Sequence, residues 1–295
     1  MGFSRAQART VPLAADALTS AMVGIGMSFA ADTEAQPNIE DTLLDASIEA
    51  MERGDLRVLS VLATWFGVHA SWVNADRLIK LVGEQKSPRL RALWSALARW
   101  QGRDRRFARL IRLYRGKALD LLAVGTDFQI HRHGEDPRFE GTALRVPANV
   151  LRDRAADALT PVELAQRHRA YRWRVTMGPG YRADMWAALE LDSHLSASEL
   201  ARRTYGSFAT AWNVRRAFAM VTGRPARISP RSQTGDPTPS RPRRGRLDQF
   251  THSSPLSGCR GGGRAATGAA KPRGAGAGRA GPREAQGSPR ASASR

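Results

Sequence analysis

An abrupt change of composition near residue 223 limits what this chain can fold into. All seven tryptophans and 19 of the 20 aromatic residues precede it, whereas residues 223–295 contain 13 glycines, nine prolines and nine serines. The first stretch is long enough for one or two hydrophobic cores of ordinary size. The second lacks the large apolar side chains that would offset the entropy of ordering its backbone. We therefore expect folded structure in residues 1–222 and a disordered tail in residues 223–295.

The tail also carries most of the formal charge, +12 of the chain's +19. Of the 46 basic residues 42 are arginine, whose planar guanidinium suits phosphate recognition. A GC-rich coding sequence would produce the same excess without any ligand. An arginine-rich tail can attract a polyanion without reading its sequence. A shifted reading frame in GC-rich DNA is a further explanation of the composition after Thr222.

Length and cysteine content exclude several classes of protein. The longest apolar run, residues 21–31, has 11 residues, about half of the ~20 needed to cross a bilayer. Pro12 and Asp16 interrupt the segment that precedes this run, which argues against a secretory leader. The single cysteine, Cys259, can form neither an intramolecular disulfide nor a pair of thiolate zinc ligands. We expect a cytoplasmic protein with no membrane partner and leave its oligomeric state open.

Helical periodicity dominates residues 37–115. Four helices are expected there, because polar residues suited to helix N-caps precede each apolar stripe. These residues are Asn38, Asp55, Ser87 and Asp104. Together with a partly helical segment in residues 1–36, the pattern indicates a mainly α fold.

The helical pattern pauses in residues 116–149 and returns at residue 160. Glycines and prolines punctuate the intervening stretch, which predicts short strands or an ordered loop. Thr160 and Glu163 have the spacing of a capping box, and they open a helix that continues to Met177. Gly178 is its predicted stop. Residues 37–177 are thus expected to form one helical domain with an irregular insert.

Residues 178–222 predict a compact unit of three short helices, at 182–190, 196–204 and 207–221. Ser196 and Glu199 have the spacing of a second capping box, and Gly206 permits a tight turn. Helical periodicity divides the third helix into two faces. The inward face is predicted to contain Phe208, Ala211, Trp212, Phe218 and Ala219, and the outward face Ala209, Thr210, Asn213, Arg216 and Ala217.

The stretch Ser196-Ala197-Ser198-Glu199-Leu200-Ala201 and the serine-capped third helix resemble the helix-turn-helix of bacterial winged-helix transcription regulators. The resemblance implies that the third helix enters the major groove of double-stranded DNA, where Asn213 can pair with adenine and Arg216 with guanine. It further implies a DNA surface completed by Arg202, Arg203, Ser207, Thr210 and Arg215, with the arginines on phosphates. Tyr205 stands where such turns commonly have glycine, and no alternating apolar run follows Thr222 to form a wing.

Two alternatives to a DNA-binding regulator remain. The first is a non-catalytic helical interaction scaffold with a protein partner, whose basic surface is simply solvated. Its arginines would include the run along the predicted helix at 104–115, a face that can follow phosphates but ordinarily faces water. These are Arg105, Arg106, Arg109, Arg112 and Arg115.

The second alternative is a metal-dependent enzyme. His131 and His133 would point the same way on a strand, and Glu135 or Asp136 would complete a ligand set, although Arg132 and Arg138 would repel a cation. No P-loop, dinucleotide fingerprint, nucleophile elbow or HExxH pair occurs in the sequence. We therefore expect no cofactor and no catalysis.

Overall fold

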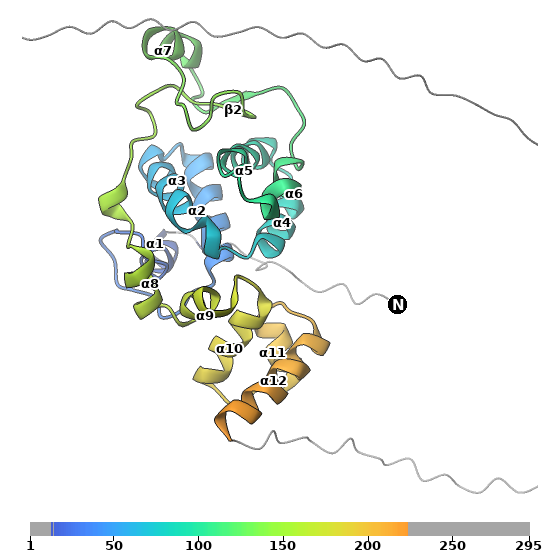
Figure 1. Ribbon diagram of the computed structural model, residues 1–295. Coiled ribbons are helices and arrows are strands. Elements are labelled where there is room, and N and C mark those ends of the chain that lie inside the picture. Colours follow the sequence, from blue (N-terminus) through green and yellow to red (C-terminus); the bar gives the residue numbers. More distant parts are fainter. Residues whose placement is uncertain (1–12, 14, 224–295) are drawn as a thin grey trace, which may run out of the picture. The chain divides into compact units, whose positions relative to one another are not determined.

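The computed structural model describes residues 13 and 15–223, and this part of the chain is mainly helical, as the sequence predicts (Figure 1). Its helices are α1 (Ala15–Gly24), α2 (Ile39–Arg53), α3 (Leu56–His69), α4 (Ala75–Glu84), α5 (Pro88–Trp100), α6 (Ala108–Ile111), α7 (Thr126–His133), α8 (Pro161–Arg167), α9 (Arg169–Met177), α10 (Tyr181–Leu191), α11 (Ala197–Arg203) and α12 (Phe208–Thr222). Three 3-10 turns join them, η1 (Ala70–Trp72), η2 (Arg105–Phe107) and η3 (Ala155–Asp157).

All described residues belong to one compact unit, which lies within Met1–Ser232. The predicted disorder of the tail lies outside the described residues, apart from Gly223, and so does the predicted absence of a wing. Within residues 13 and 15–223, no helix combines the length and the apolar character that a membrane crossing needs.

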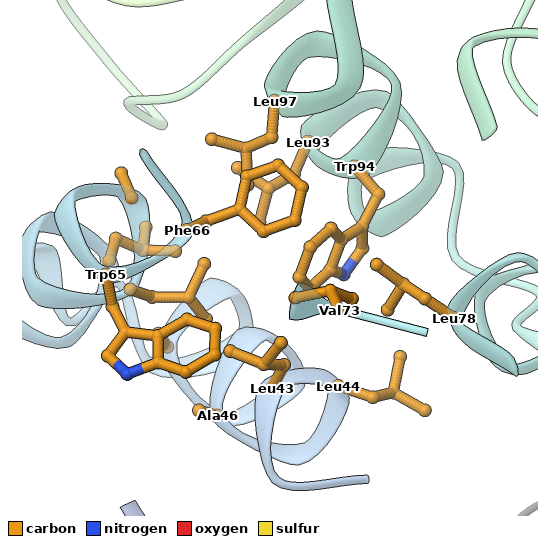
Figure 2. Packing of buried hydrophobic residues seen from close by; sticks show 14 of the residues in the cluster. Leu43, Leu44, Ala46, Trp65, Phe66, Val73, Leu78, Leu93, Trp94 and Leu97 are labelled. Atoms are coloured by element: carbon orange, nitrogen blue, oxygen red, sulfur yellow. The ribbon is translucent and has the colours of Figure 1, made fainter. Parts of the chain in front are cut away.

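A first hydrophobic core lies among α2, α3, α4 and α5. Figure 2 shows its side chains gathered around a common centre, among them Leu43, Leu44, Trp65, Phe66, Leu78, Leu93, Trp94 and Leu97. Phe66 meets Trp94 edge-on, with ring centroids 5.6 Å apart. Both buried indoles have acceptors, since Trp65 donates to the Ile25 carbonyl at 2.8 Å and Trp94 to the Ser47 hydroxyl at 3.0 Å. Trp65, Phe66 and Trp94, all of which precede the compositional break, therefore build the centre of this core.

The predicted N-caps of the first helices are confirmed. Asn38 accepts from the Asp41 N–H and opens α2, and Ser87 accepts from the Leu90 N–H and opens α5. Asp55 accepts from two backbone N–H groups and opens α3. Gly54 closes α2 with a φ of 70°, in the left-handed region that glycine reaches without steric cost.

Replacing Asp55 with alanine should destabilise the protein by about 1–2 kcal/mol. Asp55 Oδ1 accepts from the N–H groups of Arg57 at 2.9 Å and Val58 at 3.0 Å, and both would lose their acceptor. Urea denaturation followed by circular dichroism measures the effect. Asp55→Asn is the matched control, because it retains an acceptor oxygen and should recover most of the loss. An alanine variant as stable as the parent would contradict the role of this cap.

Two segments of residues 37–177, which we call the helical region, differ from the prediction. α4 is not anticipated, although Asn74 caps it by accepting from the Arg77 N–H. The helix predicted to begin at Asp104 is instead the turn η2 followed by a single turn, α6, which ends at Ile111. One reason is Arg106, whose guanidinium pairs with Asp104 and donates to the backbone carbonyls of Ala70 and Ser71 in η1. This arginine ties two elements together and does not extend a helix.

The irregular stretch 116–149 contains both strand and helix. β1 (Leu119–Asp120) pairs in parallel with β2 (Leu144–Arg145), and each strand has only two residues. α7 lies between them in the sequence and is not predicted. Arg138 fixes the following loop, because its guanidinium pairs with Asp136 and donates to the Leu151 carbonyl. Local hydrogen bonds therefore order this stretch despite its glycines and prolines.

Residues 160–177 form two helices, α8 and α9, and the prediction of one continuous helix is wrong. The reciprocal capping box of Thr160 and Glu163 is confirmed at the start of α8. His168 interrupts the helix with extended backbone, and its Nδ1 accepts from the Tyr171 N–H at 3.2 Å to cap α9. Its Nε2 donates to the Pro37 carbonyl at 2.9 Å, just before α2. A tertiary hydrogen bond thus fixes the break, and the helical pattern of the sequence does not reveal it.

Candidate nucleic-acid interface

The three helices predicted in residues 178–222 form, as α10, α11 and α12 (Figure 1). We call these three helices the three-helix unit. They enclose a second hydrophobic core, whose centre includes Met185, Trp186, Leu200, Val214 and Phe218. The Trp186 ring lies 5.1 Å from that of Phe218 on α12. This core packs α12 against α10 and α11.

The capping box predicted at the start of α11 is present only in part. Ser196 accepts from the Glu199 N–H at 3.1 Å, as expected. The Glu199 carboxylate, however, turns toward arginines one helical turn later, 2.6 Å from Arg203 and 3.9 Å from Arg202. Two cations at these spacings attract the carboxylate away from the backbone.

The turn between α11 and α12 takes its left-handed residue from Tyr205, with a φ of 58°, and not from Gly206, which the sequence predicts to permit the tight turn. A Cβ at residue 206 would lie 2.2 Å from the Met185 Cε, so the end of that buried side chain would have to move. Ser207 then caps α12 by accepting from the Thr210 N–H at 3.0 Å, and the two hydroxyls lie 2.7 Å apart.

One side of α12 is buried and the other is exposed. Ala211, Val214 and Phe218 face the core. Asn213 and Arg216 are exposed, as expected, while Thr210 and Arg215 are half-buried. We call Ser207, Thr210, Asn213 and Arg216 the reading face.

The prediction that Phe208 and Trp212 face inward is wrong. Phe208 is 49% exposed and Trp212 is 36% exposed, so both flank the reading face. The buried side is centred on Ala211, which is completely buried and small enough to let the helices approach closely. Val214, absent from the predicted inward face, occupies the position that the aromatic residues were expected to fill.

The arginines expected at phosphates differ in their surroundings. Arg202 is the most available for a phosphate contact, since its side chain is 78% exposed and its contact with Glu199 is long, at 3.9 Å. Arg203 is 53% exposed and pairs closely with the same carboxylate. Arg215 is half-buried at the edge of α12. The structure therefore brings Arg202 and Arg203 together around one carboxylate and leaves Arg215 on the neighbouring helix.

Arg174 connects this unit to the helical region and is buried. Its guanidinium binds both oxygens of Glu40 on α2, at 2.6 and 2.9 Å, and both oxygens of Asp184 on α10, at 2.8 and 3.0 Å. Burial raises the pKa of Asp184 and the neighbouring Glu40 adds to that, so attraction to Arg174 does not restore its ordinary value. Burial acts in the same direction on Glu40, but Arg174 and Arg77 outweigh it, and the pKa of Glu40 ends below its usual range.

A second buried arginine, Arg77 of α4, lies against the turn that precedes α12. It pairs with Asp41 and its Nε donates to the Asn38 Oδ1 at 3.2 Å. Its Cζ lies 3.4 Å from the centre of the Tyr205 ring, whose hydroxyl donates to the other Asp41 oxygen at 3.3 Å. Sequence reasoning missed this cluster. The available signal was the Glu40-Asp41 pair in the first turn of α2.

The metal-site interpretation does not fit the geometry. His131 and His133 lie on α7, a helix, where residues two apart point to nearly opposite sides. Glu135 follows the helix, and burial raises the pKa of its carboxyl. Among the described residues no group of three or more His, Cys, Asp or Glu side chains is arranged to hold a metal ion.

The arginine-rich segment 105–115 also differs from the predicted phosphate face. Arg106 is engaged in the backbone contacts described above, Arg109 lies 4.0 Å from Asp76, and Arg112 donates to the Ala108 carbonyl. Because α6 is a single turn, these arginines do not form one continuous helical face.

The comparisons with known proteins add no further constraint, since no family model, curated protein or solved structure matches the chain.

Proposed function

We propose that this protein binds double-stranded DNA through the reading face of α12 and acts as a transcription regulator. The observation that carries the proposal is the exposure of Asn213 and Arg216 on a helix whose opposite side is fixed in a core. Neither side chain has a hydrogen bond or ion pair to another described residue that it would have to give up. Each can make two hydrogen bonds to a base edge in the major groove.

Phosphate contacts would orient α12 on the duplex. Arg202 is the best placed for this role because it is exposed and only weakly paired. Arg203 would have to exchange Glu199 for a phosphate, and Arg215 would contribute from the edge of the helix. Such contacts fix orientation without reading sequence. The proposal also places the protein in the cytoplasm, since the bacterial regulators that residues 182–221 resemble meet their DNA there.

The double variant Asn213→Ala, Arg216→Ala should lose base preference by about 1–3 kcal/mol for each lost bidentate pair. The measurement starts with selection of preferred sites from a random duplex library by the full-length protein. Titration of the selected and scrambled duplexes then gives the ratio of affinities. Arg99→Ala is the matched control, because it removes one exposed arginine from α5. A double variant that keeps the parent's preference would refute the assignment of the reading face.

Salt dependence distinguishes orienting contacts from reading contacts. The logarithm of the binding constant should fall linearly with the logarithm of salt concentration. Arg202→Ala should weaken binding to all duplexes alike and reduce that slope by about one. No binding by the parent protein at low salt would instead favour a scaffold.

Exposed aromatic residues support the scaffold as a second candidate. Phe208 and Trp212 are spaced one helical turn apart and leave apolar surface beside the reading face. Exposed aromatic side chains of this kind are enriched where proteins bind one another. In that case α12 would meet a protein partner, and replacing Trp212 would matter more than replacing Asn213.

A further inference from the structure

The turn that leads into α12 contains a residue in a conformation that tyrosine rarely adopts. Tyr205 has a φ of 58°, in the left-handed region where a Cβ crowds the backbone. Backbone outliers of this kind persist only where the surrounding structure holds them, and they cluster at switch and binding regions. The contacts of Tyr205 therefore indicate what holds the turn.

The side-chain contacts of Tyr205 come from outside the three-helix unit, whereas its backbone N–H donates to the Arg202 carbonyl of α11 at 3.4 Å. The tyrosine ring lies on the Arg77 guanidinium of α4, and its hydroxyl reaches Asp41 of α2. Arg77 is itself completely buried and tied to Asp41 and Asn38. The backbone conformation at the start of α12 thus depends on side chains of the helical region.

The covalent connection between the two parts is short and contains two glycines. Gly178-Pro179-Gly180 joins α9 to α10, and Gly178 has a φ of 89°. Besides this connection, α9 contacts α10 through the Arg174–Asp184 and Arg172–Glu190 ion pairs and through the Trp173 and Trp186 rings, whose centroids lie 5.2 Å apart. Arg77 of α4 holds the α11–α12 turn through Tyr205. Tyr205 is the contact nearer to the reading face, because only Gly206 separates it from the Ser207 cap.

We propose that Tyr205 is a positioning residue, through which α2 and α4 hold α12 in the orientation that binds DNA. Its ring and hydroxyl hold the turn against Arg77 and Asp41, and we call these two contacts the latch. A change in α2 or α4 is then transmitted to the reading face. The consequence for DNA rests on the function proposed above, whereas the latch itself can be measured without DNA.

Tyr205→Gly is the informative variant. Glycine adopts a positive φ freely, so it removes the latch and relieves backbone crowding at the same time. Any loss of order at α12 then follows from the missing ring. Tyr205→Phe keeps the ring on Arg77 and loses only the 3.3 Å hydroxyl contact with Asp41, so it should stay close to the parent. Tyr114→Gly is the matched control, since the Tyr114 hydroxyl bonds to the Lys117 carbonyl, away from this turn.

Spin labels at two exposed positions report the orientation of α12. The labels are attached to the variants Glu52→Cys on α2 and Met220→Cys on α12. The full-length protein also carries Cys259→Ser, so that no other cysteine is labelled. The parent, Tyr205→Phe and Tyr114→Gly should give one narrow distance distribution in a pulsed dipolar measurement. Tyr205→Gly should broaden it while circular dichroism shows the helices intact. A Tyr205→Gly distribution as narrow as that of the parent would overturn the proposal.

DNA binding supplies the functional readout. If only about a tenth of Tyr205→Gly molecules hold α12 correctly, its affinity for a selected duplex should fall about tenfold. Tyr205→Phe should stay within about threefold of the parent by the same relation. Unchanged affinity in Tyr205→Gly would refute the positioning role. Absence of DNA binding in the parent would refute the proposed function, and the label distances would still decide whether the latch exists.

Discussion

Replacing Arg174 with methionine should destabilise the protein by about 3–5 kcal/mol, which is the usual effect of removing one member of a buried ion pair. Arg174 is the shared partner of Glu40 and Asp184, and all three side chains are buried. Without the guanidinium, two carboxylates face each other away from water. Urea denaturation gives the loss as a shift of the midpoint at unchanged slope.

Arg172→Met is the matched control for this prediction. It lies on the same helix and pairs with Glu190 at 2.8 Å, but its side chain is exposed. Surface pairs of this kind contribute less than about 1 kcal/mol. The triple variant Arg174→Met, Glu40→Gln, Asp184→Asn should recover part of the stability, because no buried charge of this cluster is then left alone. Equal effects of Arg172→Met and Arg174→Met would show that Arg174 is not buried as described.

The protein should also lose stability as the pH falls from 7 to 5, because two histidines are buried as neutral rings. The Nδ1 of His69 accepts from the Tyr171 hydroxyl at 2.7 Å and its Nε2 donates to the Leu159 carbonyl at 2.9 Å. His168 likewise accepts at Nδ1 and donates at Nε2. A second proton would remove an acceptor and place a charge in the core.

Burial lowers the pKa of each histidine to about 4, below an unfolded value of 6.5. A depressed histidine pKa contributes stability that is fully present above the unfolded value and is lost as the pH falls toward the folded value. Together the two rings should remove about 3–4 kcal/mol between pH 7 and pH 5.

Denaturation at a series of pH values tests this. His69→Gln and His168→Asn should each lower stability at pH 7 and remove about half of the pH-dependent loss. If the pH-dependent loss stays unchanged in both variants, the two histidines are not its origin. A parent protein equally stable at pH 7 and pH 5 would contradict the buried neutral rings altogether.

Local signals predicted much of the fold. The caps at Asn38, Asp55 and Ser87 are correct because an N-cap depends on one side chain and the next three backbone N–H groups. The three-helix unit is correct for the same reason, together with its apolar periodicity. Exposure of Asn213 and Arg216 also follows from periodicity, since neither side chain fits an apolar core.

Predictions that required knowledge of distant partners failed. The helical pattern continues through His168, but the Pro37 carbonyl, 131 residues away in sequence, fixes the break between α8 and α9. The sequence around Arg174 gives no sign that this side chain is buried, because its partners Glu40 and Asp184 lie on other helices. Phe208 and Trp212 read as core residues, yet the close approach at Ala211 leaves them at the surface.

The amino-acid pattern thus specified which segments become helices and which side of α12 is polar, because those properties depend on neighbours within about one helical turn. It could not specify how the three-helix unit is attached to the helical region. That attachment depends on buried charges brought together from α2, α4, α9 and α10, and a charged residue with a distant partner looks the same in sequence as one that faces water. Tyr205 shows both sides of this limit, since its place in the turn can be read from the sequence and its partner Arg77 cannot.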